Sequence, residues 1–399
     1  MRNLMPLCFA ALLVGGAAGA AEPLKIGVLE DMSGVYADIT GEGSVAAAEL
    51  AIADFGGEVL GRKIELVSAD HQNKADIGST TARRWYDNDG VEMITGIGNS
   101  AVALAVREVA RDKGKIDIST SAAIKKLTNE ACSPTGFHWV YDTYSLAKSV
   151  ASASVKAGGD KVFFVGADYA FGHALAEEGG KFARQAGGEV VGEVFAPLST
   201  SDYSSFVLQA QGSGANNVGL ALAGGDLVNF IKQASQFAVV EQGQNLSAFI
   251  FFIQDVHALT LPIAKGLYMS ESFYWDLTPE TRAFAERFYE RTGKMPNSLQ
   301  AGVYSAVNHY LKAVQEAGTT EAAAVAEKMR ELPVNDFYTK NAVVRADGRV
   351  MRDMYLFEVK APEASSGEWD LMELIATVPG EEAFQPLAES NCPLVAAKQ

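Results

Sequence analysis

The sequence predicts an α/β protein with two similar lobes, each a parallel sheet flanked by helices. Short apolar runs alternate with segments of helical periodicity along most of the chain. This alternation is typical of a parallel sheet that is covered on both faces. It pauses at residues 137–141 and then begins again, so the same architecture is expected twice. A length of 399 residues is sufficient for two domains.

The first series of elements covers residues 24–119. Strands are predicted where apolar runs end in polar or glycine-rich turns, and helices where apolar residues recur three or four positions apart. The glycines at 56 and 57 end the first helix. In chain order we expect strand 24–29, helix 43–55, strand 63–68, helix 76–87, a strand from 93, a helix from 102 and strand 116–119.

The second series repeats the pattern after the pause. The apolar run 248–253 is interpreted as its last strand, which would end at Gln254 and Asp255. Before that run we expect helix 146–157, strand 162–165, helix 174–185, strand 189–195, helix 206–211, strand 218–222 and helix 227–237.

The last third of the chain does not predict a third lobe. Strand 266–269, helix 279–292, helix 305–317 and a hairpin through Asp347-Gly348 are too few and too mixed for an independent sheet. Thr278 and Pro279 are typical of a helix start. We therefore expect this part to complete the first lobe and then the second. The predicted lobes are residues 21–140 with 272–350, and residues 141–271 with 351–399.

The first 20 residues predict a signal peptide. Arg2 supplies the positive end, an apolar run follows over residues 4–14, and Ala18-Gly-Ala20 is a small-residue cleavage site. The run is shorter than the about 20 residues that a membrane-spanning helix needs. No later segment is long and apolar enough either. We expect export with cleavage near Ala20.

Charge and cysteine content limit the classes of function. A net charge of −16 argues against nucleic-acid binding, because phosphates would be repelled. After cleavage only Cys132 and Cys392 remain, and in an oxidising compartment such a pair predicts one disulfide bond. Neither cysteine has a neighbouring ligand at metal-binding spacing. No metal and no cofactor are expected.

The residues that follow the predicted strands share a chemistry. They carry hydroxyl, amide, acidic and aromatic side chains, and ligands of an open parallel sheet lie beyond the carboxyl ends of its strands. Such a set suits a small polar or zwitterionic molecule. Taken singly, each residue could equally be ordinary turn chemistry. The set comprises Asp31, Ser33, Asn99, Ser100, Ser121, Ala122, Asp168, Tyr169, Phe171, Gly225, Asp226, Gln254 and Asp255.

A dinucleotide-binding enzyme is a remote alternative. Gly96-Ile-Gly-Asn-Ser-Ala101 fits the G-x-G-x-x-A fingerprint between a strand and a helix. Two strands precede this motif instead of none, and no acid follows the next strand. There is also no G-x-S-x-G elbow of a hydrolase. We therefore do not expect an enzyme.

The mature chain resembles the periplasmic solute-binding proteins of ABC transporters, of the leucine/isoleucine/valine-binding type. The resemblance implies two lobes joined by three hinge crossings, which close on a solute. It also implies a monomer in the periplasm with a membrane permease as partner. Its carriers are Ile26-Gly-Val-Leu29, Ser33-Gly34, Gly56-Gly-Glu-Val-Leu-Gly-Arg-Lys-Ile-Glu-Leu66, Asp70, Gly98-Asn-Ser100, Ser121-Ala-Ala123, Asp168-Tyr-Ala-Phe-Gly172 and Tyr304-Ser-Ala-Val-Asn-His-Tyr310.

The resemblance also implies roles for single residues. Ser100 and the backbone after Ser121 would hold the carboxylate of a branched-chain amino acid. Tyr36 would form a wall on the first lobe, and Tyr169 and Phe171 would do so on the second. The glycine-rich turn before Asp226 falls where the family often has another aromatic residue.

The amino-acid binders place an acid after the strand predicted at 248–253, where it pairs with the ammonium of the solute. Asp255 could serve here, or Gln254 could occupy that place and leave the ammonium without a partner. Binding of aromatic carboxylates or amides in the same kind of importer is therefore an alternative. A ligand-sensing subunit of a receptor is another, since it would use the same trap.

Overall fold

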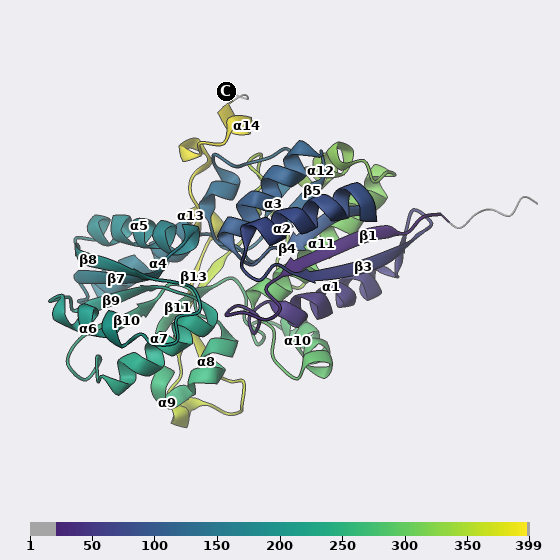
Figure 1. Cartoon of the computed structure of the whole chain (residues 1–399). Helices are drawn as coiled ribbons and strands as arrows, with labels where there is room; N and C mark the ends of the chain where they lie inside the picture. Colours follow the sequence, from purple (N-terminus) through teal and green to yellow (C-terminus); the bar gives the residue numbers. More distant parts are fainter. Residues whose placement is uncertain (1–20, 397–399) are drawn as a thin grey trace, which may run out of the picture.

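The computed structural model describes residues 21–396, so the predicted signal peptide lies outside the described residues. Two sheets with parallel strands, each flanked by helices, form the two lobes (Figure 1). The predicted fold class is thereby confirmed. The first sheet has the order β2-β3-β1-β4-β5-β6 and is parallel except for the short β2–β3 pair. Its strands are β1 (Leu24–Glu30), β2 (Glu58–Val59), β3 (Arg62–Asp70), β4 (Val91–Gly96), β5 (Ile116–Ser119) and β6 (Gly136–His138).

Helices cover both faces of the first sheet because its strands are apolar on both faces. Leu24, Ile26 and Val28 of β1 pack in the larger core, whereas Leu29 packs with Trp85 in a second core. In Figure 1, α2 and α3 lie on one face and α1 on the other, where it packs against α11. These helices are α1 (Gly41–Phe55), α2 (Ala75–Arg84), α3 (Ser100–Asp112) and α11 (Ser298–Ala317).

The second sheet has the order β10-β9-β7-β8 and is entirely parallel. Its strands are β7 (Lys161–Ala167), β8 (Glu189–Ala196), β9 (Asn217–Ala221) and β10 (Asn245–Ala248). The predicted strand 248–253 is wrong, since β10 ends at Ala248 and helix α8 (Ile253–Leu259) begins five residues later. The apolar run is a buried connection, and an apolar run alone does not distinguish that from a strand.

A third sheet also differs from the expectation. Strands β11 (Tyr268–Glu271), β12 (Met354–Val359) and β13 (Met372–Val378) form a small antiparallel sheet beside the second lobe. Tyr268 of β11 pairs with Glu358 of β12, which lies 90 residues further along the chain. Such long-range pairing leaves no local signal in the sequence.

The chain passes between the lobes three times: from β6 to α4, from β11 to α10, and from Val350 to β12. The C-terminal segment then returns to the first lobe, where Cys392 forms the predicted disulfide with Cys132. The predicted lobe boundaries themselves stay a prediction. The remaining elements are η1 (Trp85–Asp89), η2 (Lys125–Thr128), α4 (Thr143–Lys156), α5 (Ala170–Gln185), α6 (Ser204–Gly212), α7 (Gly224–Gln236), α9 (Leu261–Ala264), α10 (Pro279–Thr292), α12 (Ala322–Glu331), η3 (Pro362–Ala364), α13 (Gly380–Ala383), η4 (Leu387–Glu389) and α14 (Pro393–Ala396).

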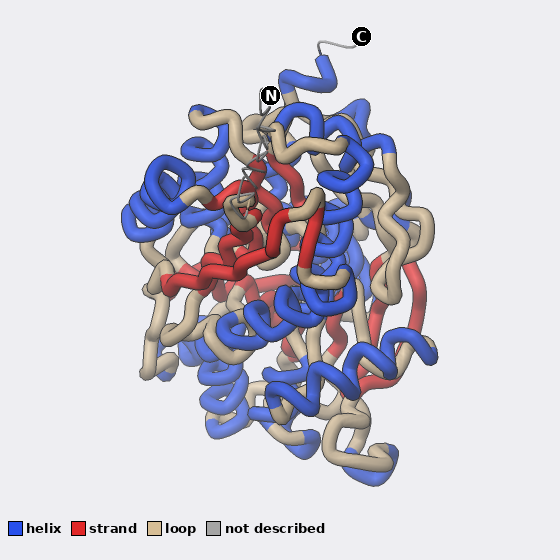
Figure 2. Tube along the Cα trace, turned by 90° about the vertical axis from the view of Figure 1, so that its right-hand side faces the viewer, coloured by secondary structure: helices blue, strands red, loops and turns tan. Residues whose placement is uncertain are grey.

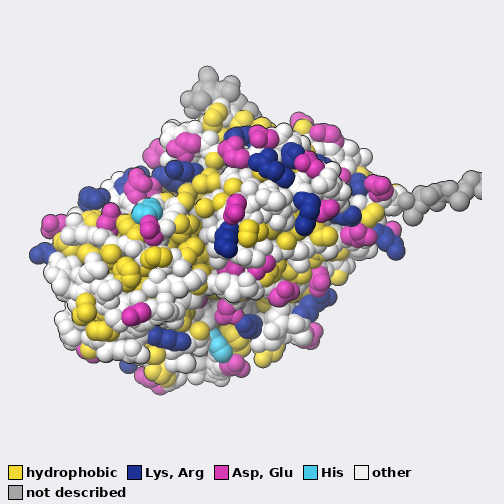
Figure 3. All heavy atoms as spheres, in the orientation of Figure 1, with side chains coloured by type: hydrophobic (Ala, Val, Ile, Leu, Met, Phe, Trp, Pro, Cys, Tyr) yellow, Lys and Arg dark blue, Asp and Glu magenta, His cyan; other side chains and the backbone are white. Residues whose placement is uncertain are grey.

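The view from the side shows the strands lying between helices (Figure 2). Acidic and basic side chains are interspersed over the face shown in Figure 3. Within residues 21–396 no helix is long and apolar enough to cross a membrane.

Candidate functional site

A small cavity of ≈ 20 Å³ lies between the two lobes. That volume is about what one water molecule needs, so the lobes lie close together in this structure. The carboxyl ends of β4 and β5 face it from the first lobe, and those of β7 and β9 from the second. Its lining consists of Tyr36, Ile39, Thr40, Gly98, Ser100, Ser121, Ala123, Tyr141, Tyr169, Phe171, Ala223, Ile250 and Leu299.

Helix α3 begins at the cavity. Asn99 is its N-cap, with Oδ1 accepting hydrogen bonds from the amides of Ala101 (2.9 Å) and Val102 (3.2 Å). Ser100 comes next and lines the cavity, and no hydrogen bond within the described part of the chain uses its hydroxyl as donor. The structure therefore places Ser100 at the cavity, whereas the side chain of Asn99 caps the N-terminus of helix α3.

The turn after β5 contributes two lining residues. Ser121 lines the cavity, and its Oγ donates to Oε1 of Glu30 at 2.7 Å. Ala122 does not line it; its carbonyl lies 2.7 Å from Nε2 of His138. Ala123 takes the place that the prediction gave to Ala122.

Glu30, the last residue of β1, is fully buried beneath this turn. A Cβ atom on Gly98 would lie 2.5 Å from its Oε2, and one on Gly96 2.8 Å from its Oε1. The two glycines of the G-x-G-x-x-A motif therefore make room for an acidic side chain of the same chain. This contact explains the motif without a dinucleotide. Burial raises the pKa of Glu30 to about 8.

Aromatic rings form the walls of the cavity. The hydroxyl oxygens of Tyr36 and Tyr169 lie 2.9 Å apart, and the ring centroids of Tyr169 and Phe171 5.8 Å apart. All three residues line the cavity, as the prediction placed them. Tyr141 lines it too, and its buried hydroxyl has no hydrogen-bond partner among residues 21–396. Sequence reasoning missed Tyr141, although it ends the aromatic run at 137–141.

Three predicted site residues of the second lobe do not reach the cavity. Oδ2 of Asp226 accepts from the amide of Ser199 at 3.0 Å, and Ala223 lines the cavity instead. Oδ2 of Asp255 accepts from the amide of Phe252 at 3.0 Å, at the start of α8. Burial raises the pKa of Asp255 to about 7.

Gln254 also lies outside the lining. Its Nε2 donates to the carbonyl of Met295 at 2.8 Å, and its Oε1 accepts from Asn297 at 3.0 Å. Because β10 ends at Ala248, the residue that reaches the cavity from this segment is Ile250. Neither Gln254 nor Asp255 lines the cavity in this structure, and their role in binding stays a prediction.

The other residues that the prediction missed are mostly apolar or have no polar side-chain end. The prediction considered mainly polar turn residues, whereas the missed residues are mostly apolar and have no polar side chain that would mark them in the sequence. They are Ile39, Thr40, Gly98, Ala123, Ala223, Ile250 and Leu299. Among the described residues that line the cavity, none carries a carboxylate or a cation. In the part of the chain that the structure describes, no cluster of three or more His, Cys, Asp or Glu side chains could hold a metal ion.

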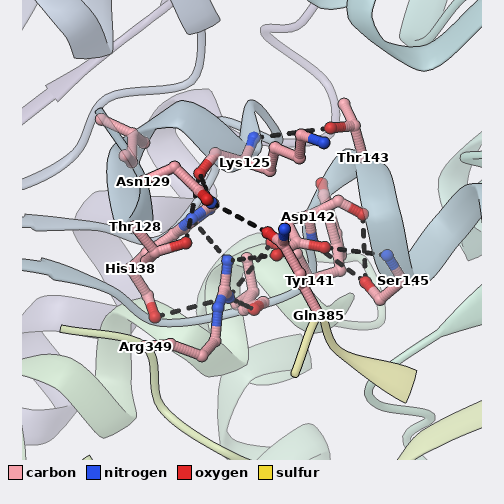
Figure 4. A network of polar contacts seen from close by, with 12 residues as sticks. Lys125, Thr128, Asn129, His138, Tyr141, Asp142, Thr143, Ser145, Arg349 and Gln385 are labelled. Carbon is pink, nitrogen blue, oxygen red and sulfur yellow. Dashed lines mark hydrogen bonds and ion pairs between the residues drawn. The ribbon is translucent and has the colours of Figure 1, made fainter. Parts of the chain in front are cut away.

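A buried polar network at the hinge supports the turn after β5 (Figure 4). Arg349 donates to Oδ2 of Asp142 at 2.9 Å and to Nδ1 of His138 at 2.6 Å. Because Nδ1 accepts this bond, the ring proton of His138 is on Nε2, which donates to the carbonyl of Ala122. Burial and the neighbouring Arg349 hold the pKa of His138 well below its usual range. The hinge is thus linked by direct hydrogen bonds to the turn after β5, whose Ser121 and Ala123 line the cavity.

Comparison with known proteins places this site in a family. Residues 23–367 match the family model described as periplasmic binding protein. The chain is 27% identical over 360 residues to Leu/Ile/Val-binding protein homolog 7 of Brucella suis biovar 1, covering 84% of this chain and 87% of the relative.

Two solved structures are also similar. A periplasmic binding protein from Burkholderia mallei is 48% identical, with a TM-score of 0.91, covering 93% of this chain and 99% of that chain. A branched chain amino acid ABC transporter periplasmic ligand-binding protein from Burkholderia xenovorans is 39% identical, with a TM-score of 0.82, covering 93% and 100%. With the two-lobed fold and the cavity between the lobes, these matches show that the chain belongs to the family of periplasmic binding proteins of ABC transporters.

Proposed function

We propose that this protein captures a small carboxylate solute between its lobes and delivers it to the membrane permease of an ABC importer. The observation that carries the proposal is the cavity that residues of both lobes line, together with the Tyr36–Tyr169 contact that joins the lobes there. Capture then follows from domain closure: an open form binds the solute on one lobe, and closure buries it.

The first lobe offers the groups that a carboxylate needs. Asn99 already binds the amides of Ala101 and Val102, so the hydroxyl of Ser100 remains available at the start of α3. The positive end of the helix dipole favours an anion at this position. Ser121 is the second hydroxyl on the same side of the cavity.

The rest of the lining favours an apolar or aromatic body. Tyr36, Tyr141, Tyr169 and Phe171 present rings, Ile250 is the lining residue from the segment after β10, and none of the described lining residues carries a carboxylate that could pair an ammonium group. A buried ammonium without a partner costs several kcal/mol. The geometry therefore favours carboxylates that have no ammonium group.

A branched-chain amino acid is the second candidate solute. The relative from Burkholderia xenovorans, 39% identical to this chain, is described as belonging to a branched-chain amino acid transporter. For this candidate the ammonium would have to bind the tyrosine hydroxyls or backbone carbonyls of the cavity.

Export is part of the proposal. Residues 1–20 would direct the chain across the membrane and be cleaved near Ala20, and the mature protein would act as a monomer. Mass spectrometry of the exported protein tests the cleavage site.

A thermal-shift screen with matched pairs tests the solute class. Leucine is compared with 4-methylpentanoate, and phenylalanine with 3-phenylpropanoate, since each pair differs only in the ammonium group. A ligand at 100 times its Kd adds about 2.7 kcal/mol to the unfolding free energy. A shift with the acids alone supports the first candidate, and a shift with the amino acids alone supports the second. No shift with any of these or with benzoates would contradict a carboxylate solute.

A further inference from the structure

Glu30 is an acid without a cation, one hydrogen bond away from the cavity. None of the described hydrogen bonds or ion pairs brings a Lys, Arg or His side chain to it. Its Oε1 accepts from Ser121 at 2.7 Å and from Ser44 at 3.2 Å, and its Oε2 has no hydrogen-bond partner within residues 21–396. Glu30 does not line the cavity, but Ser121 does. A change at the carboxyl group can therefore reach a solute through Ser121.

The hydroxyl of Ser121 has one proton, and the charge of Glu30 decides where that proton points. An ionised Glu30 can only accept, so Ser121 donates to it and presents a lone pair to the cavity. A Glu30 protonated on Oε1 donates to Oγ of Ser121, while Ser44 still donates to the same oxygen. The proton of Ser121 then points into the cavity, because Thr120, whose Oγ1 lies 3.5 Å from Oγ of Ser121, can be the donor of that contact.

We propose that Glu30 determines the charge of the solute that the cavity accepts: protonated Glu30 makes Ser121 a donor for a carboxylate, and ionised Glu30 makes Ser121 an acceptor for an N–H group. This inference rests on the proposed function, because it concerns a solute in the same cavity. Glu30 is thus a specificity-determining residue that acts through Ser121 without touching the solute.

The surroundings favour the protonated form at neutral pH. The titratable groups whose charges interact with Glu30 are Asp31, which opposes ionisation of Glu30, and the lining residue Tyr141. From the other elements packed against the carboxyl come the uncharged Ser44 of α1, Gly96 and Gly98. Burial with these neighbours raises the pKa of Glu30 to about 8, which places its titration between pH 7 and 9.

The test compares the wild type with Glu30→Gln, which keeps the shape and removes the charge. Binding of 4-methylpentanoate and 3-phenylpropanoate is measured by calorimetry at pH 7, 8 and 9. In the wild type the protonated fraction falls about tenfold between pH 7 and 9, so Kd for an acid is expected to rise about tenfold. Glu30→Gln is expected to keep the pH 7 affinity at pH 9.

Ser44→Ala is the matched control. The substitution removes the second hydroxyl that donates to Glu30, and Ser44 itself does not line the cavity. The pH dependence of Kd should therefore persist, with its midpoint at a higher pH. A readout without solute is the infrared carbonyl band of a protonated carboxyl group, which should fade in the wild type near pH 8 and be absent from Glu30→Gln.

The outcomes separate the two proposals. Tight binding of an acid with the same Kd at pH 7 and 9 in the wild type would overturn the role of Glu30 and leave the proposed function intact. Equal pH dependence in the wild type and Glu30→Gln would overturn it as well. No binding of any acid by the wild type at any pH would overturn the carboxylate function, and the role of Glu30 with it.

Discussion

The hydroxyl oxygens of Tyr36 and Tyr169 lie 2.9 Å apart and join the two lobes across the cavity. A second bond, from the amide of Gly225 to the carbonyl of Val35 at 2.9 Å, joins the lobes nearby. Single hydrogen bonds contribute only about 0.5–1.5 kcal/mol each. Contacts of this strength favour closure without fixing it, so a solute that bridges the lobes can shift the equilibrium.

Tyr169→Phe is expected to favour the open form of the solute-free protein, because it removes the hydroxyl contact with Tyr36. A loss of about 1 kcal/mol changes the open-to-closed ratio roughly fivefold. Small-angle X-ray scattering would detect this as a larger radius of gyration. Tyr310→Phe is the control, since its buried hydroxyl has no partner among residues 21–396. If both variants scatter like the wild type, the contact does not govern closure.

Ser100→Ala is expected to weaken a carboxylate solute by roughly 1–3 kcal/mol, the cost of losing a hydrogen bond to a charged group. Calorimetric titration with the acid found in the screen measures this. Ser79→Ala is a suitable control, because Ser79 lies on α2 and donates only to the carbonyl of Asp76. An unchanged affinity of Ser100→Ala would mean that the carboxylate binds elsewhere in the cavity.

Sequence reasoning located the first-lobe side of the site better than the second. Ser100 and Ser121 follow strands whose ends are marked by glycine or polar turns, and both line the cavity. The second lobe offered an apolar run from 248 to 253 with no internal signal for where pairing stops. The strand ends at Ala248, and the residue of this segment that lines the cavity is Ile250, with Gln254 and Asp255 outside the lining.

The fold was predictable where contacts are local and less so where they are distant. Alternating strands and helices gave both parallel sheets, and Thr278 with Pro279 marked the start of α10. The antiparallel sheet of β11, β12 and β13 depends on pairing between distant segments. Tyr141 was missed for a related reason, because a buried aromatic residue at a hinge has the sequence pattern of ordinary core.

Asp255→Asn is expected to flatten the pH dependence of stability and to leave solute affinity unchanged. Its pKa rises from 3.8 to about 7 on folding, so the protonated form is favoured in the folded state. The resulting stabilisation is complete below about pH 4 and is lost as pH rises through 7. It amounts to roughly 4 kcal/mol at most, at 1.36 kcal/mol per pKa unit.

Urea unfolding of Asp255→Asn between pH 4 and 8 measures this effect. Asparagine can still accept the hydrogen bond from the amide of Phe252, so the helix cap is kept. The same fall in stability with pH as in the wild type would show that Asp255 is not the group responsible. A large loss of solute affinity in Asp255→Asn would show that Asp255 takes part in solute binding.

Removing the disulfide should lower stability and leave the cavity intact. Cys132 and Cys392 are 260 residues apart and pack with Val395 in a small separate core. Loss of a disulfide typically costs about 2–5 kcal/mol. The double variant Cys132→Ser/Cys392→Ser should therefore melt at a lower temperature but bind the solute as before. Thiol counting on denatured, unreduced, exported protein checks the bond, and two free thiols would contradict it.

Arg349→Met should destabilise the protein by about 3–5 kcal/mol, because it leaves Asp142 as a buried charge without its partner. The variant also frees Nδ1 of His138, and with it the hydrogen bond that fixes the carbonyl of Ala122 beside Ser121. Solute affinity should fall along with stability, since the turn that carries Ser121 and Ala123 loses this support.

Arg349→Lys and Arg282→Met separate these effects. Lysine keeps the charge but cannot donate to Asp142 and His138 in the same fork, so Arg349→Lys should recover stability more than affinity. Arg282→Met removes an exposed pair with Asp276 and should change the unfolding free energy by about 1 kcal/mol or less. Urea unfolding and calorimetry on the three variants measure both quantities. An affinity unaffected by Arg349→Met would mean that the turn after β5 holds its position without the hydrogen bonds that lead from Arg349 through His138 to Ala122.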